Sequence, residues 1–272
     1  MPPARMPLWR GMRPRKRWRY VAIFCEELMA CAAVVQVGPA QQTFWAVLLR
    51  GEAVGSGSRS EPRLLERTRL LPRRGTVELT AGRLRIRERN LMLDFALAED
   101  AGIEVVCPHG NAHVWTRKQA GVAARGTIAL DSGPPRTIEA RAVIDDTAGY
   151  HARVTEWRWA AGVGVGPNGA PLAFNLVAGV NDPSRGSERA VWIAGAPREV
   201  APVRFAPDLS RIVGDDGSEL NFAAEAQRSR RENLLLVRSE YRAPFGTFSG
   251  VLPGGVELAH GLGVVEHHRA RW

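Results

Sequence analysis

Residues that could transfer protons gather near the middle of the 272-residue chain. Asp145 and Asp146 precede His151 by a few positions in the segment IDDTAGYH. A carboxylate beside an imidazole orients the ring and raises its basicity, as general acid–base catalysis requires. The same letters also suit a turn, because aspartate side chains cap turns well. Both interpretations stay open for the two aspartates, and His151 is a candidate cavity residue.

The segment that follows predicts a wall of mixed polar and aromatic side chains. If residues 150–165 form a strand, alternate side chains share a face. That face then carries His151, Arg153, Thr155, Trp157 and Trp159. Such a combination differs from ordinary sheet filling, so we interpret it as one wall of a ligand cavity.

A second acid–base pair stands near the carboxyl end. Glu266 and His268 are two positions apart in VVEHH, so on a strand they point the same way. Facing a lumen, they could share proton transfer. The alternative is a strand whose polar face is exposed to solvent.

Lys118 is one of only two lysines in a chain otherwise rich in arginine. Inside an apolar barrel it would need a lowered pKa or a carboxylate partner, and Asp145 or Glu266 could provide that partner. Exposed on a turn, it would have no functional meaning.

Two further side chains are candidates for ligand contact. Asn175 interrupts the apolar segment LAFNLVAGV, and a buried amide must bond either a ligand or a neighbouring strand. Trp115 would line either a core or a pocket.

Metal and cofactor sites are not predicted. Cys107, His109 and His113 have spacings that zinc could use, but no fourth ligand is apparent. The glycines of AAGVGVG fail as a dinucleotide loop because no helix follows them. We therefore expect neither a metal nor a cofactor.

The elements that must position these residues are short strands. From Thr76 onward, segments such as RLRIRE, LMLDFALA and RTIEARAVI recur between turn residues. This pattern predicts an all-β protein of two packed antiparallel β-barrels with very little helix, such as a short one near residues 64–70. The predicted division is a disordered basic arm over 1–15, one barrel over 16–146 and a second over 147–272.

The net charge of +9 is concentrated at the amino terminus. Seven basic and no acidic residues precede Tyr20, and the remainder holds 30 basic against 28 acidic residues. Nucleic-acid binding is therefore not expected, whereas the arm could contact a phospholipid surface weakly. A charged, proline-rich arm makes few buried contacts, so its removal up to Arg13 is expected to leave the thermal midpoint unchanged.

Three cysteines form no CxxC motif or even-numbered disulfide framework, which is typical of a reducing compartment. The apolar stretch 20–37 is interrupted by Glu26 and Glu27, and no segment is long and apolar enough to span a membrane. The sequence predicts a soluble cytoplasmic protein.

Several motifs resemble those of one known family. They are VWTRKQAGV, IDDTAGYHAR, EWRWAAGVG, FNLVAGVND, SERAVW, RENLLLVRSEYR, PFGTFSG and GLGVVEHH. From Lys16 to Trp272 the chain resembles the bacterial domain of unknown function 2804 family, whose members usually carry a longer amino-terminal stretch. That family is distantly similar to carotenoid hydratases of the hydroxyneurosporene synthase type. The resemblance implies two lipocalin-like (calycin-type) barrels with an apolar ligand cavity, and it implies no reaction.

The resulting hypothesis is a barrel cavity that binds an isoprenoid- or lipid-like molecule, with cofactor-independent hydratase or lyase activity. Protonation of an alkene needs a positioned acid, and aromatic faces stabilise a carbocation. The proton-transfer candidates are His151, Asp145, Asp146, Glu266 and Lys118, and the ligand-contact candidates are Trp157, Trp159, Asn175, Trp115, Arg153 and His268. The alternatives are a non-catalytic lipid carrier and a structural module whose cavity is filled by side chains.

Overall fold

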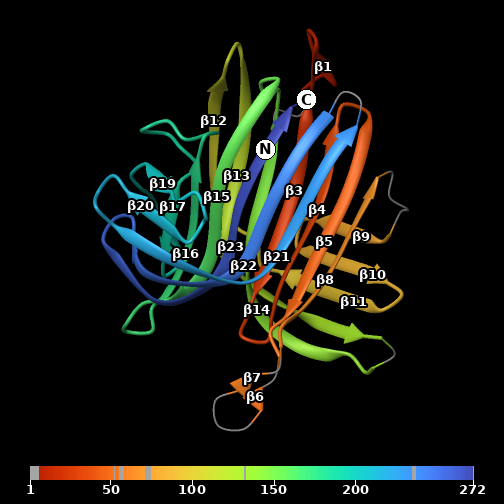
Figure 1. The fold of residues 1–272 in the computed structure, drawn as a ribbon, viewed down its shortest axis with the longest axis vertical. Coiled ribbons are helices and arrows are strands. Elements are labelled where there is room, and N and C mark those ends of the chain that lie inside the picture. Colours follow the sequence, from red (N-terminus) through yellow and green to blue (C-terminus); the bar gives the residue numbers. More distant parts are fainter. Residues whose placement is uncertain are drawn as a thin grey trace.

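The structure is a computed structural model that describes residues 6–51, 53–54, 58–59, 61–70, 75–131, 133–234 and 237–271. Within these residues every regular element is a β-strand, and no helix could cross a membrane (Figure 1). The strands form two large antiparallel sheets and two small hairpins.

The first large sheet contains the amino-terminal half of the chain. Its strand order is β8 (Arg63–Leu70), β5 (Ala40–Leu49), β4 (Leu28–Val37), β3 (Lys16–Phe24), β14 (Arg136–Gly149), β13 (Ala112–Leu130), β11 (Leu91–Leu97), β10 (Arg83–Glu88) and β9 (Val77–Thr80). β12 (Ile103–His109) pairs with the beginning of β13. β3 and β4 form a hairpin that turns at Glu26 and Glu27.

The second large sheet contains the carboxyl-terminal half. Its order is β18 (Ala196–Glu199), β17 (Ala190–Ile193), β16 (Pro171–Ala178), β15 (Val154–Val165), β23 (Val256–Arg271), β22 (Val237–Leu252), β21 (Glu219–Leu234), β20 (Arg211–Gly214) and β19 (Val203–Phe205). The chain changes sheet between Gly149 and Val154. The division into folding units at residues 146 and 147 stays a prediction.

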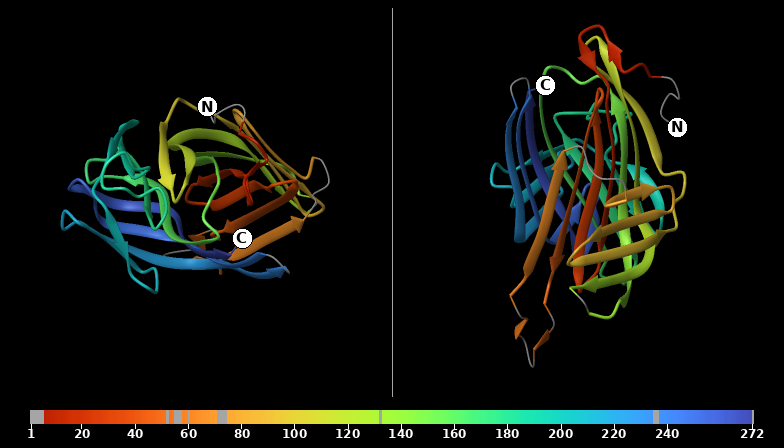
Figure 2. Two further views of the ribbon diagram at one scale, coloured as in Figure 1. Left: turned by 90° about the horizontal axis from the view of Figure 1, so that it is seen from above. Right: turned by 90° about the vertical axis from the view of Figure 1, so that its right-hand side faces the viewer.

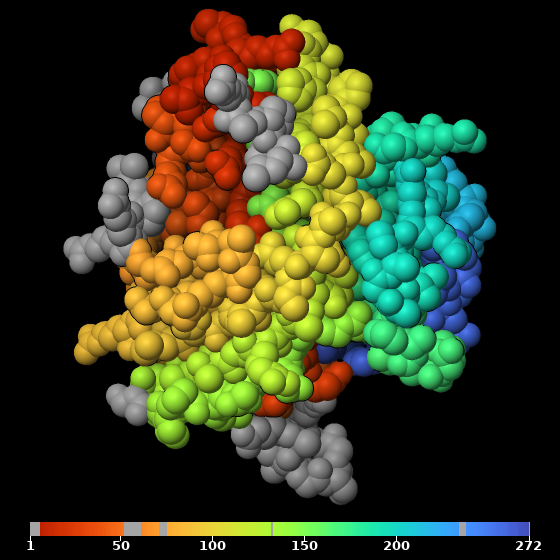
Figure 3. All heavy atoms as spheres, turned by 180° about the vertical axis from the view of Figure 1, so that it is seen from behind, coloured from red at the N-terminus to blue at the C-terminus, as the bar shows by residue number. Residues whose placement is uncertain are grey.

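Side-chain alternation gives each sheet two buried faces. One face of the first sheet encloses an apolar core that includes Ile23, Phe95 and Ile144. One face of the second sheet encloses another apolar core, which includes Phe174 and Phe248. The remaining faces meet in a third apolar cluster that joins the two sheets. Figures 2 and 3 show the two halves packed side by side.

The all-β fold with two packed antiparallel, lipocalin-like barrels is thus confirmed. The short helix expected near residues 64–70 is wrong, because this segment forms strand β8. β8 pairs with β5 over its whole length, with Trp45 opposite Arg67. Edge pairing to an existing sheet outweighs the weak local preference for helix.

Residues 6–15 of the predicted disordered arm are ordered and docked, whereas residues 1–5 lie outside the described residues. They form a hairpin of β1 (Trp9–Arg10) and β2 (Arg13–Pro14). Met6 is buried in a small cluster that includes Trp115 and Tyr150. The Tyr150 hydroxyl donates a 2.7 Å hydrogen bond to the carbonyl of Pro7. These buried contacts, which composition does not reveal, fix the segment.

The hairpin presents apolar side chains to solvent, namely Leu8, Trp9 and Met12. Arg10 lies beside them and is also exposed. Weak contact of this basic segment with a phospholipid surface stays a prediction.

Deleting residues 1–13 is now expected to destabilise the fold, contrary to the expectation from composition. Removal exposes Trp115 and takes away the acceptor of the Tyr150 hydroxyl. The loss should be about 1–3 kcal/mol in the free energy of unfolding. Urea unfolding of the full and shortened chains measures it, with Met12→Ser as a control at an exposed position. Equal stability of the two chains would contradict the docked hairpin.

Candidate functional site

The residues singled out around β15 lie between the two barrels instead of inside one of them. Trp157 and Trp159 share one face of β15, as alternation predicted, and this face packs toward the first sheet. Opposite them on β23 are His268, paired with Trp157, and Glu266, paired with Trp159. β15 begins only at Val154, so Arg153 precedes the strand and is exposed. The expectation that Arg153 shares this face is therefore wrong.

A buried lysine joins the two barrels through two carboxylates. The ammonium group of Lys118, on β13, lies 2.8 Å from Oδ1 of Asp145, on β14, and 3.2 Å from Oε1 of Glu188, which precedes β17. Lys118 and Glu188 are each 3 % exposed. Burial acts to lower the pKa of Lys118, but the two carboxylates outweigh it and the pKa is raised. Lys118 is therefore a charged ammonium.

Donors from both barrels hold the two carboxylates. Asp145 accepts hydrogen bonds from the indole of Trp18 at 3.0 Å and the hydroxyl of Thr147 at 2.7 Å. Glu188 accepts one from the amide of Asn181 at 3.0 Å. Burial raises the pKa of Glu188, while Lys118 opposes that shift. Because its members are buried and bonded to each other, this network holds the two barrels together.

Asn175 is bonded within the protein. Its amide donates to the backbone carbonyl of Glu188 at 2.8 Å, and its oxygen accepts from the indole of Trp159 at 2.7 Å. The buried amide was expected to bond either a ligand or a neighbouring strand, and in the structure it bonds neighbouring protein groups.

The predicted carboxylate–imidazole pair near residue 150 does not form. Asp146 points to the opposite face of β14 from Asp145 and binds Arg19 and Arg117, each at 2.8 Å. His151 has no hydrogen-bond partner on either ring nitrogen within the described part of the chain. Consecutive strand residues alternate between faces, so Asp145 and Asp146 cannot act together on one substrate.

Trp115 also lies away from the site. It is paired with Ala148 and packs with Met6, on the face of β13 opposite that of Lys118. Of the two predicted surroundings of Trp115, core or pocket, the structure therefore shows a small apolar core.

Glu266 is the carboxylic acid of the site. It is 9 % exposed, and its Oε1 accepts a 2.7 Å hydrogen bond from the indole of Trp157. Burial raises its pKa to about 7, against the hydrogen bonds from Trp157 and Tyr241 that act to lower it. Near neutral pH a large fraction of Glu266 therefore carries a proton that it can donate.

The imidazole of His268 stays neutral beside this acid. It bonds the hydroxyl of Ser239 at 2.8 Å, and its ring centroid lies 4.3 Å from that of Trp157. Burial lowers its pKa to about 3. His268 can therefore take part in hydrogen bonding without adding charge near Glu266.

Trp157 and Tyr241, the two aromatic residues that bond Glu266, each pack against a half-buried ring of the first sheet. Trp18 stacks on Trp157 with ring centroids 6.4 Å apart, and Phe44 faces Tyr241 at 6.2 Å. The guanidinium of Arg228 lies 4.3 Å from the Phe44 ring centroid. These four rings pack at the edge of the apolar cluster that joins the sheets and keep partial exposure. The arrangement offers an apolar molecule an aromatic surface beside an acid.

The three residues with zinc-like spacing do not converge on a metal. Within the described ranges, no three Cys, His, Asp or Glu side chains form a metal-ligating group. His113 bonds Arg10, whereas the ring of His109 contacts that of His151. The thiol of Cys107 faces the carbonyl of Gly186, and burial raises its pKa to about 11.

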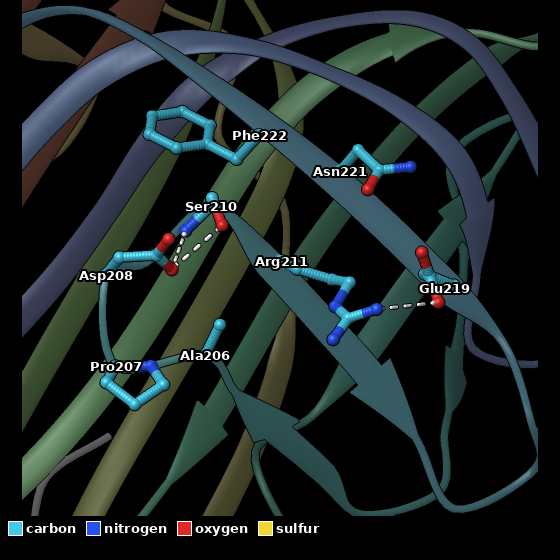
Figure 4. Close-up of a pocket in the computed structure, with 8 residues that line it drawn as sticks. All are labelled: Ala206, Pro207, Asp208, Ser210, Arg211, Glu219, Asn221 and Phe222. Atoms are coloured by element: carbon cyan, nitrogen blue, oxygen red, sulfur yellow. Dashed lines mark hydrogen bonds and ion pairs between the residues drawn. The ribbon is translucent and has the colours of Figure 1, made fainter.

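A surface hollow of about 670 Å³ lies on the second barrel, away from these groups (Figure 4). Its lining residues are Ala206, Pro207, Asp208, Ser210, Arg211, Glu219, Asn221 and Phe222. Arg211 pairs with Glu219 at 3.5 Å, and Asp208 accepts from Ser210. These polar groups satisfy one another, so the hollow offers less chemistry than the site at Glu266.

Comparison with known proteins assigns the chain to a family. Residues 65–272 match the model of a family described as a domain of unknown function, DUF2804. The chain belongs to the DUF2804 family. The matched range begins in β8, whereas the resemblance seen in the sequence was drawn from Lys16. Lys118, Asp145, Glu188 and Glu266 of this DUF2804 protein all lie within the matched range.

Solved structures of similar fold are distant in sequence. Kievitone hydratase from Nectria haematococca is 12 % identical, with a TM-score of 0.55 over 93 % of this chain and 88 % of that one. An AttH-like protein from Nitrosomonas europaea is 13 % identical, with a TM-score of 0.54 over 93 % and 92 %. No curated protein matches the sequence significantly. At these identities the likeness establishes a shared fold and no shared chemistry.

Sequence reasoning about this DUF2804 protein missed Glu188, Tyr241 and Arg228. Glu188 lies in the loop between β16 and β17, and it contacts Lys118 only because the barrels pack together. The one signal for Glu188 was its place in SERAVW, which belongs to the family resemblance. Tyr241 lies on β22 opposite His268 of β23, and Arg228 lies on β21 opposite Ala243 of β22, so strand register fixes the position of both.

Proposed function

We propose that this DUF2804 protein binds an apolar, isoprenoid- or lipid-like small molecule between its two barrels. We further propose that it adds water to, or removes water from, that molecule without a cofactor. The observation that carries the proposal is Glu266, a buried acid with a pKa of about 7 beside the aromatic rings of Trp157 and Tyr241. One neighbour in fold is named a hydratase, so the fold is compatible with such chemistry.

The proposed hydration uses Glu266 as general acid and then as general base. Its O–H donates a proton to one alkene carbon, which leaves a carbocation on the other carbon and a carboxylate on Glu266. The faces of Trp157 and Trp159 stabilise the cation. A water molecule bonds to the cationic carbon and returns a proton to Glu266, so the acid is restored. Dehydration follows the same steps in reverse.

The Lys118 network has a positioning role in this proposal. Asp145 holds the indole of Trp18, and the backbone of Glu188 holds Asn175, which in turn fixes Trp159. These bonds orient aromatic rings from both barrels toward the ligand. Asp145 and Lys118 are thus proposed to act through other side chains and not on the reacting atoms.

The test begins with the ligand that co-purifies with the protein, identified by native mass spectrometry and solvent extraction. That ligand is then incubated with fresh protein in D₂O. A product that carries both an added hydroxyl and deuterium on carbon supports hydration. A ligand that is bound and recovered unchanged supports the carrier function instead, and repeated recovery of empty protein contradicts both.

Replacing Trp157 by alanine should weaken binding of the recovered ligand. Loss of the half-buried indole removes apolar contact of about 1–3 kcal/mol, which corresponds to an increase of roughly 5-fold to 150-fold in Kd. Isothermal titration calorimetry measures the change. Trp9→Ala is the matched control, because Trp9 is a tryptophan whose side chain is exposed to solvent on β1. Equal affinity of the Trp157 variant and the control would place the ligand elsewhere.

A further inference from the structure

A histidine is buried in the connection between the two large sheets, and the described residues provide no hydrogen-bond partner for its ring nitrogens. His151 lies in the connection from β14 to β15 and is only 2 % exposed. In the described part of the chain, neither Nδ1 nor Nε2 of its ring has a partner. Nε2 of His109, whose ring centroid is 5.6 Å from that of His151, is equally without one. A buried polar atom left unbonded costs free energy, so this grouping calls for a bonding partner.

The charge around His151 is positive. Lys16, the first residue of β3, pairs with Gly149 two positions before His151 and is 1 % exposed. Burial and the nearby charge of Arg13 lower the pKa of Lys16 to about 7. Burial, Lys16, His109 and His268 lower the pKa of His151 well below its usual range. A bound anion would act to raise the lowered pKa values of Lys16 and His151, because it stabilises the charged form of each group.

A cation fits this position poorly. Lys16 and Arg13 would repel a metal ion, and the side chains that perturb His151 are all basic. An ammonium and imidazole N–H groups are instead the donors that bind carboxylate and phosphate oxygens in proteins.

The aromatic surface of the proposed ligand site begins at this group. The ring centroid of Trp18 lies 5.3 Å from that of His151, and Trp18 stacks on Trp157, which bonds Glu266. A ligand whose polar end bonds Lys16 and His151 can therefore lay its apolar body along Trp18 and Trp157. Its reacting carbons then lie next to Glu266.

We propose that Lys16, His109 and His151 form an anion-binding subsite that takes the carboxylate or phosphate head group of the apolar ligand. This inference rests on the proposed function for the position of the apolar body. The ligand is thus an amphipathic molecule with an anionic end, such as an acyl or isoprenoid carboxylate or phosphate.

The test compares three probes of equal chain length: dodecanoate, dodecyl phosphate and dodecanol. Calorimetry should show that one of the two anions binds about tenfold or more tightly than dodecanol, as a charge-assisted hydrogen bond provides. The tighter anion identifies the head group. In Lys16→Met and His151→Leu this preference should fall to about twofold, while dodecanol affinity stays unchanged. Arg17→Met is the matched control, since Arg17 is the exposed neighbour of Lys16.

Inorganic phosphate tests the subsite without an apolar body. Phosphate should shift the ring resonances of His151 in a saturable manner, and the shift should disappear in Lys16→Met. His151→Leu should fold with undiminished stability, because the ring nitrogens it removes have no hydrogen-bond partner among the described residues. Equal affinity for all three probes, or a preference retained in both variants, overturns the subsite. If dodecanol does not bind but phosphate still shifts His151, the subsite stands and the apolar-ligand proposal fails.

Discussion

Lys118→Met is expected to lower the free energy of unfolding by about 3–5 kcal/mol at pH 7, as removal of one partner from a buried ion pair does. Methionine fills the volume of the lysine stem but leaves Asp145 and Glu188 buried without their shared counter-charge. The change also weakens the connection between the barrels, because Asp145 belongs to the first sheet and Glu188 to the loop that leads into β17 of the second. Urea unfolding at pH 7 measures the loss.

Two companion variants separate lost charge compensation from lost packing. The triple variant Lys118→Met, Asp145→Asn, Glu188→Gln removes all three charges and should recover most of the stability. Arg125→Met is the control, because Arg125 and Glu139 form an exposed pair at 2.6 Å and its loss should cost about 0–1 kcal/mol. A Lys118→Met loss no larger than that of the control would show that the network does not connect the barrels.

The pH dependence of this loss gives a further check. Burial already raises the pKa of Glu188, so without the Lys118 ammonium this carboxylate takes up a proton more readily at pH 5 than at pH 7. The destabilisation by Lys118→Met should therefore be smaller at pH 5 than at pH 7. An effect that does not change with pH would indicate that packing, not charge, dominates.

The strands and their alternation could be predicted from the sequence because they depend on local patterns. Turn residues bound most elements, and period 2 correctly put Trp157 and Trp159 on one face. Register between distant strands is set by packing, so the pairing of Trp157 with His268 was not predictable. The docked hairpin at residues 6–15 was missed for the same reason, since its contact with Tyr150 joins segments 143 positions apart.

The location of the site between the barrels could not be predicted either. β3 buries Val21 and Ile23 on one face and Tyr20, Ala22 and Phe24 on the other. Because both faces are apolar, alternation does not reveal which of them lines a barrel interior. The sequence therefore led to a cavity within a barrel, whereas the polar groups meet where two barrels pack.

Glu266→Gln is expected to reduce turnover of the identified substrate by about 10²–10⁴-fold while the Kd changes little. Glutamine keeps the shape of the side chain and can still accept from the indole of Trp157, but it has no proton to give to an alkene. Glu257→Gln is the matched control, because Glu257 is an exposed carboxylate on the same strand, β23. Turnover retained in the Glu266 variant would exclude Glu266 as the acid.

The same variant should change how stability depends on pH. The pKa of Glu266 is about 7 in the folded state and 4.5 ordinarily, so between these values the folded state binds more protons than the unfolded one. Stability contributed by this group is thus present below pH 4.5 and is lost as pH rises toward 7, by about 3 kcal/mol at 1.36 kcal/mol per pKa unit. Relative to Glu266→Gln, the wild-type protein should lose this amount between pH 4.5 and 8, and Glu257→Gln should behave as wild type. Urea unfolding across that range measures the difference. The two measurements test different properties, because the pH dependence of stability depends on a buried acid and turnover depends on its catalytic action. If Glu266→Gln loses the pH dependence but keeps full turnover, Glu266 is a buried acid that takes no part in catalysis.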